Sequence, residues 1–122
     1  MILKNFLLVA AGGSIGAAMR YAVYLLIKNQ PFPYATFCIN IAGSFLLGII
    51  MALSLNADEI SESTKLFLAT GICGAFTTFS TFSFENLALL QQGKYNLAFI
   101  YTITSVLSGL LAAWLGFKII YQ

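Results

Sequence analysis

The sequence predicts an all-α integral membrane protein in which four helices cross the bilayer and the third is broken near its middle. Hydrophobic residues make up 60% of the 122 residues and charged residues only 8%, whereas about a quarter of a soluble domain is charged. The apolar residues fall into four stretches, each near the roughly 20 residues that a spanning helix needs. The 6 basic and 4 acidic residues stand mostly where these stretches end.

The four helices are predicted at residues 3–27, 34–55, 65–90 and 95–120, in a single domain covering 1–122. The first stretch begins like a signal peptide, but its apolar character continues past Gly16, so we predict a spanning helix. The connections at 28–33, 56–64 and 91–94 contain turn-forming or helix-starting residues. Because they are short, neighbouring helices must run antiparallel, with both termini on one side.

Small residues are expected to bring the first two helices close to other helices. Membrane helices pack through small side chains that let their backbones approach. The small residues in question are Gly12, Gly13, Gly16 and Ala17 in the first helix, and Gly43, Ser44 and Gly48 in the second.

The third helix contains glycines and hydroxyl residues that favour a break between positions 74 and 80. Gly71 and Gly74 precede Thr77 and Thr78. A break at membrane depth frees backbone carbonyls, which must then be satisfied by protein, water or an ion. The alternative is a continuous helix whose glycines receive a neighbouring helix.

The aromatic residues of the same segment indicate an anion pathway. Phe76, Phe79 and Phe82 recur every third residue and are expected to share a face, with Ser80 and Thr81 beside them. Phenyl edges are electropositive and hydroxyls donate hydrogen bonds, so both attract an anion without a full countercharge. Conduction needs this balance between attraction and release. The alternative is a Phe stripe that packs against lipid or core.

Three further polar residues are candidates for the pathway. Asn40 lies near the centre of the second helix, where it could join helices or donate hydrogen bonds to an ion. Arg20 could concentrate anions in a vestibule, and Glu85 could order the mouth of a path. Both charged side chains could instead extend to the membrane surface from near a helix end.

The residue inventory argues against an enzyme. The chain has no histidine, and its two cysteines, Cys38 and Cys73, lack metal-site spacing. We find no nucleophile with a base and no phosphate-binding loop. We also expect no nucleic-acid partner.

The distribution of basic residues gives almost no preferred orientation. One side carries Lys4, Lys65 and Lys118, and the other carries Lys28, Lys94 and, if it reaches, Arg20. A chain without this bias can insert both ways, which permits an antiparallel homodimer. The alternative is that so few lysines do not decide orientation.

Three motifs together resemble the Fluc/CrcB family of fluoride channels. They are GGSIGAAMRY at 12–21, TFCINIAGSFLLG at 36–48 and GAFTTFSTFSFE at 74–85. The third is the most specific, and the resemblance extends over nearly the whole chain. Ala35 and Ala75 stand where glycine is expected in many members, and Ala75 lies beside the proposed break.

The resemblance implies a dual-topology antiparallel dimer in a bacterial inner membrane, with two fluoride pores that confer fluoride resistance. It implies that Phe79 and Phe82 present ring edges to fluoride, that Asn40 donates a hydrogen bond, and that Ser80 and Thr81 form a polar track. Tyr101 and Ser105 are possible further lining residues.

The resemblance also implies a structural sodium ion at the centre of the dimer. Its ligands would be backbone carbonyls at the two helix breaks, which correspond here to Gly74 and Thr77.

Two other functions remain open at this stage. A small multidrug-type proton-coupled exporter would need an intramembrane carboxylate, which is expected in the first helix. Here the first helix has no acidic residue, and Glu85, toward the end of the third helix, is the only candidate. A non-transporting assembly subunit would use the hydroxyls only to join helices.

Overall fold

The computed structural model describes residues 1–55 and 59–121. Four helical stretches within it are long and apolar enough to cross a membrane: Ile2–Leu26, Tyr34–Leu53, Glu62–Gln91 and Tyr95–Ile120. The prediction of four spanning helices is therefore confirmed. Part of the predicted second connection, residues 56–58, lies outside the described residues.

The first two spans are the continuous helices α1 (Ile2–Leu26) and α2 (Tyr34–Leu53), and the last is α6 (Tyr95–Ile120). The third is assembled from α3 (Glu62–Lys65), the π-helix η1 (Leu66–Cys73), α4 (Gly74–Phe76) and α5 (Phe79–Gln91). It begins at Glu62, before the predicted Lys65, because the Ser61 hydroxyl accepts a hydrogen bond from the Thr64 amide at 3.1 Å.

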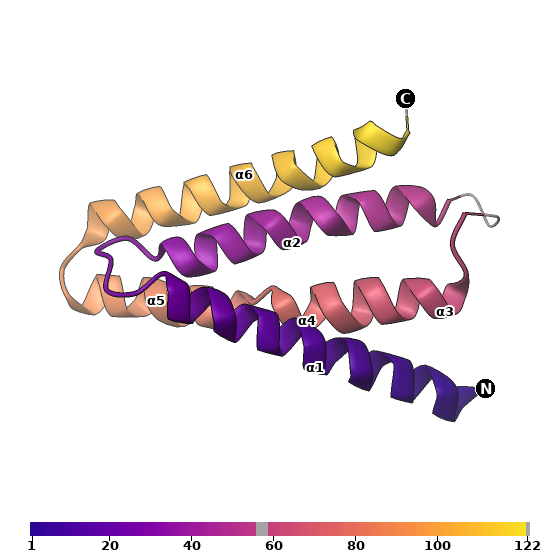
Figure 1. Cartoon of the computed structure of the whole chain (residues 1–122). Coiled ribbons are helices and arrows are strands. Elements are labelled where there is room, and N and C mark those ends of the chain that lie inside the picture. The colour runs from indigo at the N-terminus through magenta and orange to yellow at the C-terminus, as the bar shows by residue number, and fades with distance from the viewer. Residues whose placement is uncertain (56–58, 122) are drawn as a thin grey trace.

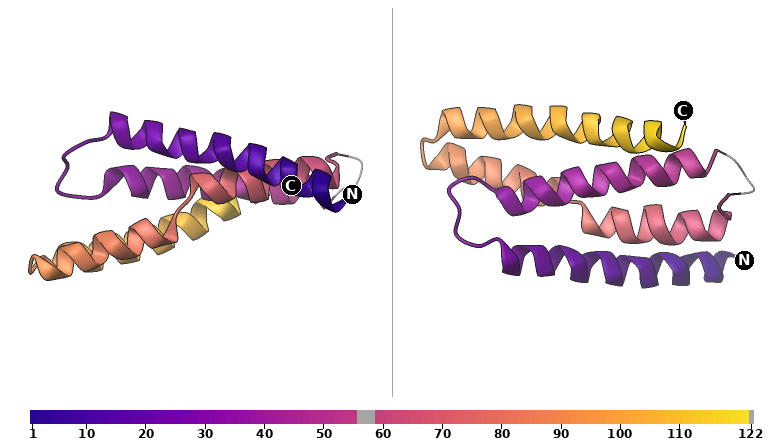
Figure 2. Two further views of the ribbon diagram at one scale, coloured as in Figure 1. Left: turned by 90° about the horizontal axis from the view of Figure 1, so that it is seen from below. Right: turned by 45° about the horizontal axis from the view of Figure 1, so that its top comes forward.

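The helices run antiparallel in sequence order, and both termini lie at the same end of the bundle, as predicted (Figure 1). α2 lies between α6 and the first part of the third span, from α3 to α4, whereas α5 packs on α6 (Figure 1). Seen from below, α5 and the adjoining part of α6 form a hairpin that leans away from α1 and α2 (Figure 2). The broken helix thus belongs to two parts of the bundle, one on each side of its break.

Glycines set the closest helix contacts. A Cβ at Gly12 or Gly16 would collide with backbone carbonyls of η1, at Phe67 and Ile72 respectively. On the other side of the bundle, a Cβ at Gly48 would meet the backbone of α6. The packing role predicted for these glycines is confirmed, and it holds the first half of the third span against α1.

The turn between α5 and α6 is a glycine-based helix cap. Gly93 adopts φ = 72°, a left-handed conformation that glycine takes without steric cost. Its amide donates to the Leu90 carbonyl at 3.0 Å, and the Lys94 amide donates to the Leu89 carbonyl at 2.9 Å. This Schellman arrangement ends α5 and directs the chain straight back along it as α6.

Candidate ion pathway

The break in the third span consists of two consecutive threonines in extended conformation. Thr77 has φ = −79° and ψ = 157°, and Thr78 has φ = −151° and ψ = 122°. The Thr77 hydroxyl donates to the Cys73 carbonyl at 2.8 Å, at the end of α4. The Thr78 hydroxyl accepts from the Thr81 amide at 3.2 Å and so caps the N-terminus of α5. The predicted break is confirmed, and its position follows from this pair of caps.

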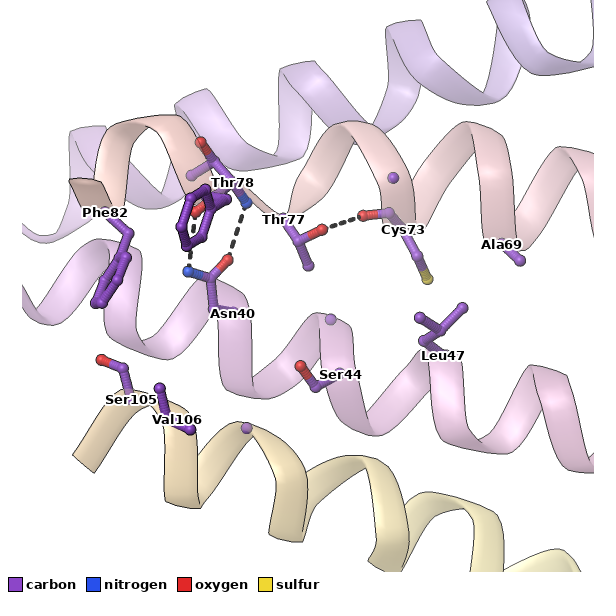
Figure 3. A pocket seen from close by; sticks show the side chains of 14 residues that line it. Asn40, Ser44, Leu47, Ala69, Cys73, Thr77, Thr78, Phe82, Ser105 and Val106 are labelled. Atoms are coloured by element: carbon purple, nitrogen blue, oxygen red, sulfur yellow. Dashed lines mark hydrogen bonds between the residues drawn. The ribbon is translucent and has the colours of Figure 1, made fainter. Parts of the chain in front are cut away.

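Asn40 of α2 bonds to both backbone groups of Thr78 and replaces the helical partner that the break takes from the Thr78 amide. Its Nδ2 donates to the Thr78 carbonyl at 3.1 Å, and its Oδ1 accepts from the Thr78 amide at 2.9 Å (Figure 3). In an unbroken helix the Thr78 amide would donate to the Gly74 carbonyl. Asn40 takes that amide instead, which leaves the Gly74 carbonyl without its usual partner. The predicted role of Asn40 in joining helices therefore has a geometric basis.

A cavity of about 340 Å³ lies between α2, α6 and the segments on both sides of the break (Figure 3). Four of the predicted pathway residues line it: Asn40, Phe79, Phe82 and Ser105. Gly74 and Thr77, the predicted sodium-binding positions, line it as well. The Ser105 hydroxyl is buried and has no hydrogen-bond partner among the described residues, so it has an unused donor at the cavity.

Aromatic rings continue from the cavity toward the end of the bundle. The ring centroids of Phe79 and Phe82 are 5.9 Å apart, and those of Phe82 and Tyr101 are 5.0 Å apart. Phe32, in the connection between α1 and α2, meets Tyr101 edge-on at 5.2 Å. Four rings therefore form a row from the break to the first connection.

The prediction that Phe76 shares a face with Phe79 and Phe82 is wrong. Phe76 ends α4 and is buried, whereas Phe79 begins α5 and is 79% exposed. The extended residues between them interrupt the helical periodicity on which that prediction relied. Only Phe79 and Phe82 of the three line the cavity.

Glu85 is held in a hydrogen-bond network of hydroxyl groups. The Thr36 hydroxyl donates to its Oε1 and the Tyr101 hydroxyl donates to its Oε2, both at 2.7 Å. The Tyr24 hydroxyl lies 2.8 Å from that of Thr36. Because Thr36 gives its only hydrogen to Glu85, Tyr24 must be the donor in that contact. One carboxylate thus joins side chains from α1, α2, α5 and α6.

The remaining predicted residues lie outside the cavity. Ser80 and Thr81 are next to Thr78 at the start of α5, with hydroxyl separations of 3.3 and 3.1 Å. Arg20 is partly exposed on α1 and does not line the cavity. Tyr101 is fully buried beside Phe82, at the border between the cavity and the Glu85 network.

Sequence reasoning missed three residues of this region: Tyr24, Thr36 and Phe32. Thr36 and Glu85 are 49 positions apart, so only tertiary structure brings them together. The available signal was Glu85 itself, since a charge at that depth needs hydrogen-bond partners, but nothing in the sequence indicates which hydroxyls supply them.

Comparisons with known proteins point in one direction. The family model described as CrcB-like protein, Camphor Resistance (CrcB), matches residues 7–117. A protein of Azobacteroides pseudotrichonymphae genomovar. CFP2 named Fluoride-specific ion channel FluC is 42% identical over 119 residues, which cover 95% of each chain. A Thermus thermophilus protein with the same name is 42% identical over 96% of this chain and 95% of its own. Fluoride-specific ion channel FluC 1 of Listeria innocua is 43% identical over 94% of this chain and 96% of its own.

Proposed function

The chain belongs to the CrcB family, and from this premise we propose that it is a fluoride-selective ion channel. It is a multi-pass protein of a bacterial inner membrane, and fluoride leaves the cytoplasm passively through this protein. The observation that carries this function is a cavity that offers hydrogen-bond donors and aromatic edges at the helix break, with no charged side chain among its lining residues.

The lining suits a small anion that must bind and then leave. The Asn40 Nδ2 atom carries two hydrogens, of which the Thr78 carbonyl takes one. Ser105 adds an unused hydroxyl, and Phe82 supplies a ring whose edge is electropositive. Neutral donors attract fluoride without trapping it in an ion pair, which is the condition for conduction.

We further propose that the channel works as an antiparallel homodimer with two pores, each lined by both chains. Phe79 lines the cavity yet is 79% exposed in the single chain, so one chain does not enclose a path at that point. The nearly balanced lysines permit opposite insertion. A second copy against this face would cover Phe79 and separate the path from lipid.

A structural sodium ion is proposed at the centre of that dimer, held by the Gly74 and Thr77 carbonyls. The residues present fit such an ion, because the break deprives the Gly74 carbonyl of the Thr78 amide. Among the described residues, no group of three or more His, Cys, Asp or Glu side chains could hold a metal ion. The donors proposed here are backbone oxygens, which suit a hard cation. The bound ion would balance the carbonyls and fix the two breaks relative to each other.

The geometry of Glu85 argues against proton-coupled export. In a proton-coupled exporter, the carboxylate binds a proton and the substrate alternately, so its oxygens must be free to form and break these contacts. Both oxygens of Glu85 already accept short hydrogen bonds from hydroxyls on other helices. We therefore propose that Glu85 organises the end of the path, and that the protein is a channel and not an enzyme.

Fluoride efflux from liposomes tests this function. Purified protein is reconstituted in vesicles loaded with fluoride or chloride, and valinomycin balances the charge. We expect rapid fluoride efflux, little chloride efflux, no need for a pH gradient, and loss of efflux in Phe82→Ile. Phe84→Ile is the matched control, because Phe84 lies on the same helix, is 70% exposed and does not line the cavity. Absence of fluoride efflux from folded protein would refute the proposal, and dependence on a proton gradient would favour the exporter.

A further inference from the structure

α5 carries Phe79 and Phe82, yet the helix before it does not determine its orientation. Thr77 and Thr78 are extended, so the helical hydrogen-bond ladder does not continue from α4 into α5. Rotation of α5 about its own axis is therefore governed by the bonds of Thr78 to Asn40 at the break and by the elements that α5 contacts beyond it.

Within the chain, α5 packs mainly on α6. α5 and the adjoining part of α6 form the hairpin that leans away from α1 and α2 (Figure 2). The Gly93 turn fixes their connection at one end. Along the hairpin, side-chain contacts must set how far α5 is turned.

Besides the ring contact of Phe82 with Tyr101, two consecutive hydrogen-bonded pairs of side chains connect α5 to α6. The first is Glu85 with Tyr101, which belongs to the network already described. The second is Asn86 with Thr102: the Thr102 hydroxyl donates to the Asn86 Oδ1 at 3.0 Å. The Asn86 Nδ2 donates in turn to the carbonyl of Phe82 at 3.0 Å. A continuous chain of hydrogen bonds thus runs from α6 to the backbone of a cavity-lining residue.

The bond from Thr102 differs from those of its neighbours on α6. Hydroxyls in membrane helices commonly donate to a carbonyl of their own helix, one turn earlier. Thr104 does so toward Ile100 at 2.6 Å, and Ser108 does so toward Thr104. Thr102 instead donates across to Asn86, so its hydroxyl joins two helices.

We propose that Asn86 and Thr102 are positioning residues that hold α5 at the rotation in which Phe82 faces the cavity. Phe82 lies one helical turn before Asn86, so both side chains project from the same side of α5. Fixing Asn86 against α6 therefore fixes the direction of the Phe82 ring. This inference rests on the proposed channel function. It adds two residues that determine the fluoride efflux rate of the channel and its selectivity for fluoride over chloride.

The test compares Thr102→Val with Thr104→Val in the full-length reconstituted protein. Both changes replace a hydroxyl by a methyl group on α6, but only the first removes a bond to α5. We expect Thr102→Val and Asn86→Leu to reduce fluoride efflux roughly 3- to 15-fold, the effect of losing one hydrogen bond between membrane helices. Fluoride efflux relative to chloride efflux should also fall. Thr102→Ser should restore both, because it keeps the hydroxyl.

A coupling measurement adds specificity. The double variant Thr102→Val/Asn86→Leu should be no worse than the more impaired single variant, because both remove the same bond. The proposal is overturned if Thr102→Val conducts like the unmodified protein, if Thr104→Val is equally impaired, or if Thr102→Ser fails to restore efflux.

A spectroscopic readout separates this proposal from the channel function itself. 4-Fluorophenylalanine placed at position 82 reports the environment of that ring by ¹⁹F NMR in detergent. Its resonance should shift or broaden in Thr102→Val and stay unchanged in Thr104→Val. If the unmodified protein conducts no fluoride, the channel proposal fails and the resonance alone decides: a change specific to Thr102→Val supports positioning, and an unchanged resonance overturns it.

Discussion

Replacing Asn40 by alanine should destabilise the fold through the helix break. The change removes two hydrogen bonds, at 2.9 and 3.1 Å, to the amide and carbonyl of Thr78. Thr78 is only 7% exposed, so water replaces these partners poorly. Hydrogen bonds between membrane helices average about 0.6 and reach about 1.7 kcal/mol, and a buried polar group left without a partner costs about 1–3 kcal/mol. Two lost bonds therefore predict a decrease in unfolding free energy of about 2–4 kcal/mol.

The assay is denaturant unfolding in mild detergent, followed by the fluorescence of Trp114, the only tryptophan of the chain. Ser44→Ala is the matched control. Ser44 is one turn from Asn40 on α2 and lines the same cavity, but no bond to the break depends on it. Its unfolding free energy should stay within about 0.5 kcal/mol of the original. A loss below about 1 kcal/mol in Asn40→Ala, or an equal loss in Ser44→Ala, would refute the view that Asn40 stabilises the break.

Three other sets of substitutions test separate parts of the structure. Gly48→Ala and Gly116→Ala each place a Cβ against the backbone of the facing helix. Each substitution should lower the unfolding free energy by about 1–3 kcal/mol. The double variant should lose less than the sum of the two, because a single increase in the distance between α2 and α6 relieves both clashes. Gly93→Ala should cost about 1–2 kcal/mol, because φ is 72° there, and Gly93→Asn should cost less; equal losses in the same unfolding assay would contradict this explanation. Glu85→Gln should reduce fluoride efflux, because an amide nitrogen cannot accept one of the two hydroxyl bonds; unchanged efflux would contradict a role for that network.

The sequence predicted the helices well because length and hydropathy determine which segments cross a bilayer. It also predicted a broken third helix, since two glycines before two threonines weaken helix formation. It placed the break between positions 74 and 80, but it did not identify Thr77 and Thr78 as the two extended residues within that window. That position depends on Asn40, which contributes its amide from 38 residues away in the sequence. The error over Phe76 has the same origin, because a helical face continues only while the helix does.

The Glu85 network lay beyond sequence reasoning for a different reason. In a soluble helix, polar residues mark the outward face and so reveal which side is buried. A membrane helix is apolar toward lipid and toward its neighbours alike, so hydropathy does not indicate which helices meet. Glu85 was recognisable as a candidate by its charge, whereas Thr36 and Tyr24 became partners only through the positions of α1 and α2.

The two roles that the sequence left open for Asn40 are compatible because of the chemistry of its side chain. A carboxamide has a donor and an acceptor side by side, so it pairs with both the amide and the carbonyl of Thr78. An aspartate could not donate to that carbonyl. The second Nδ2 hydrogen remains available where Asn40 lines the cavity. The residue that satisfies the break can therefore also donate to an anion beside it. A polar site at membrane depth is tolerated here because the same side chain also replaces the helical partner that the Thr78 amide lacks.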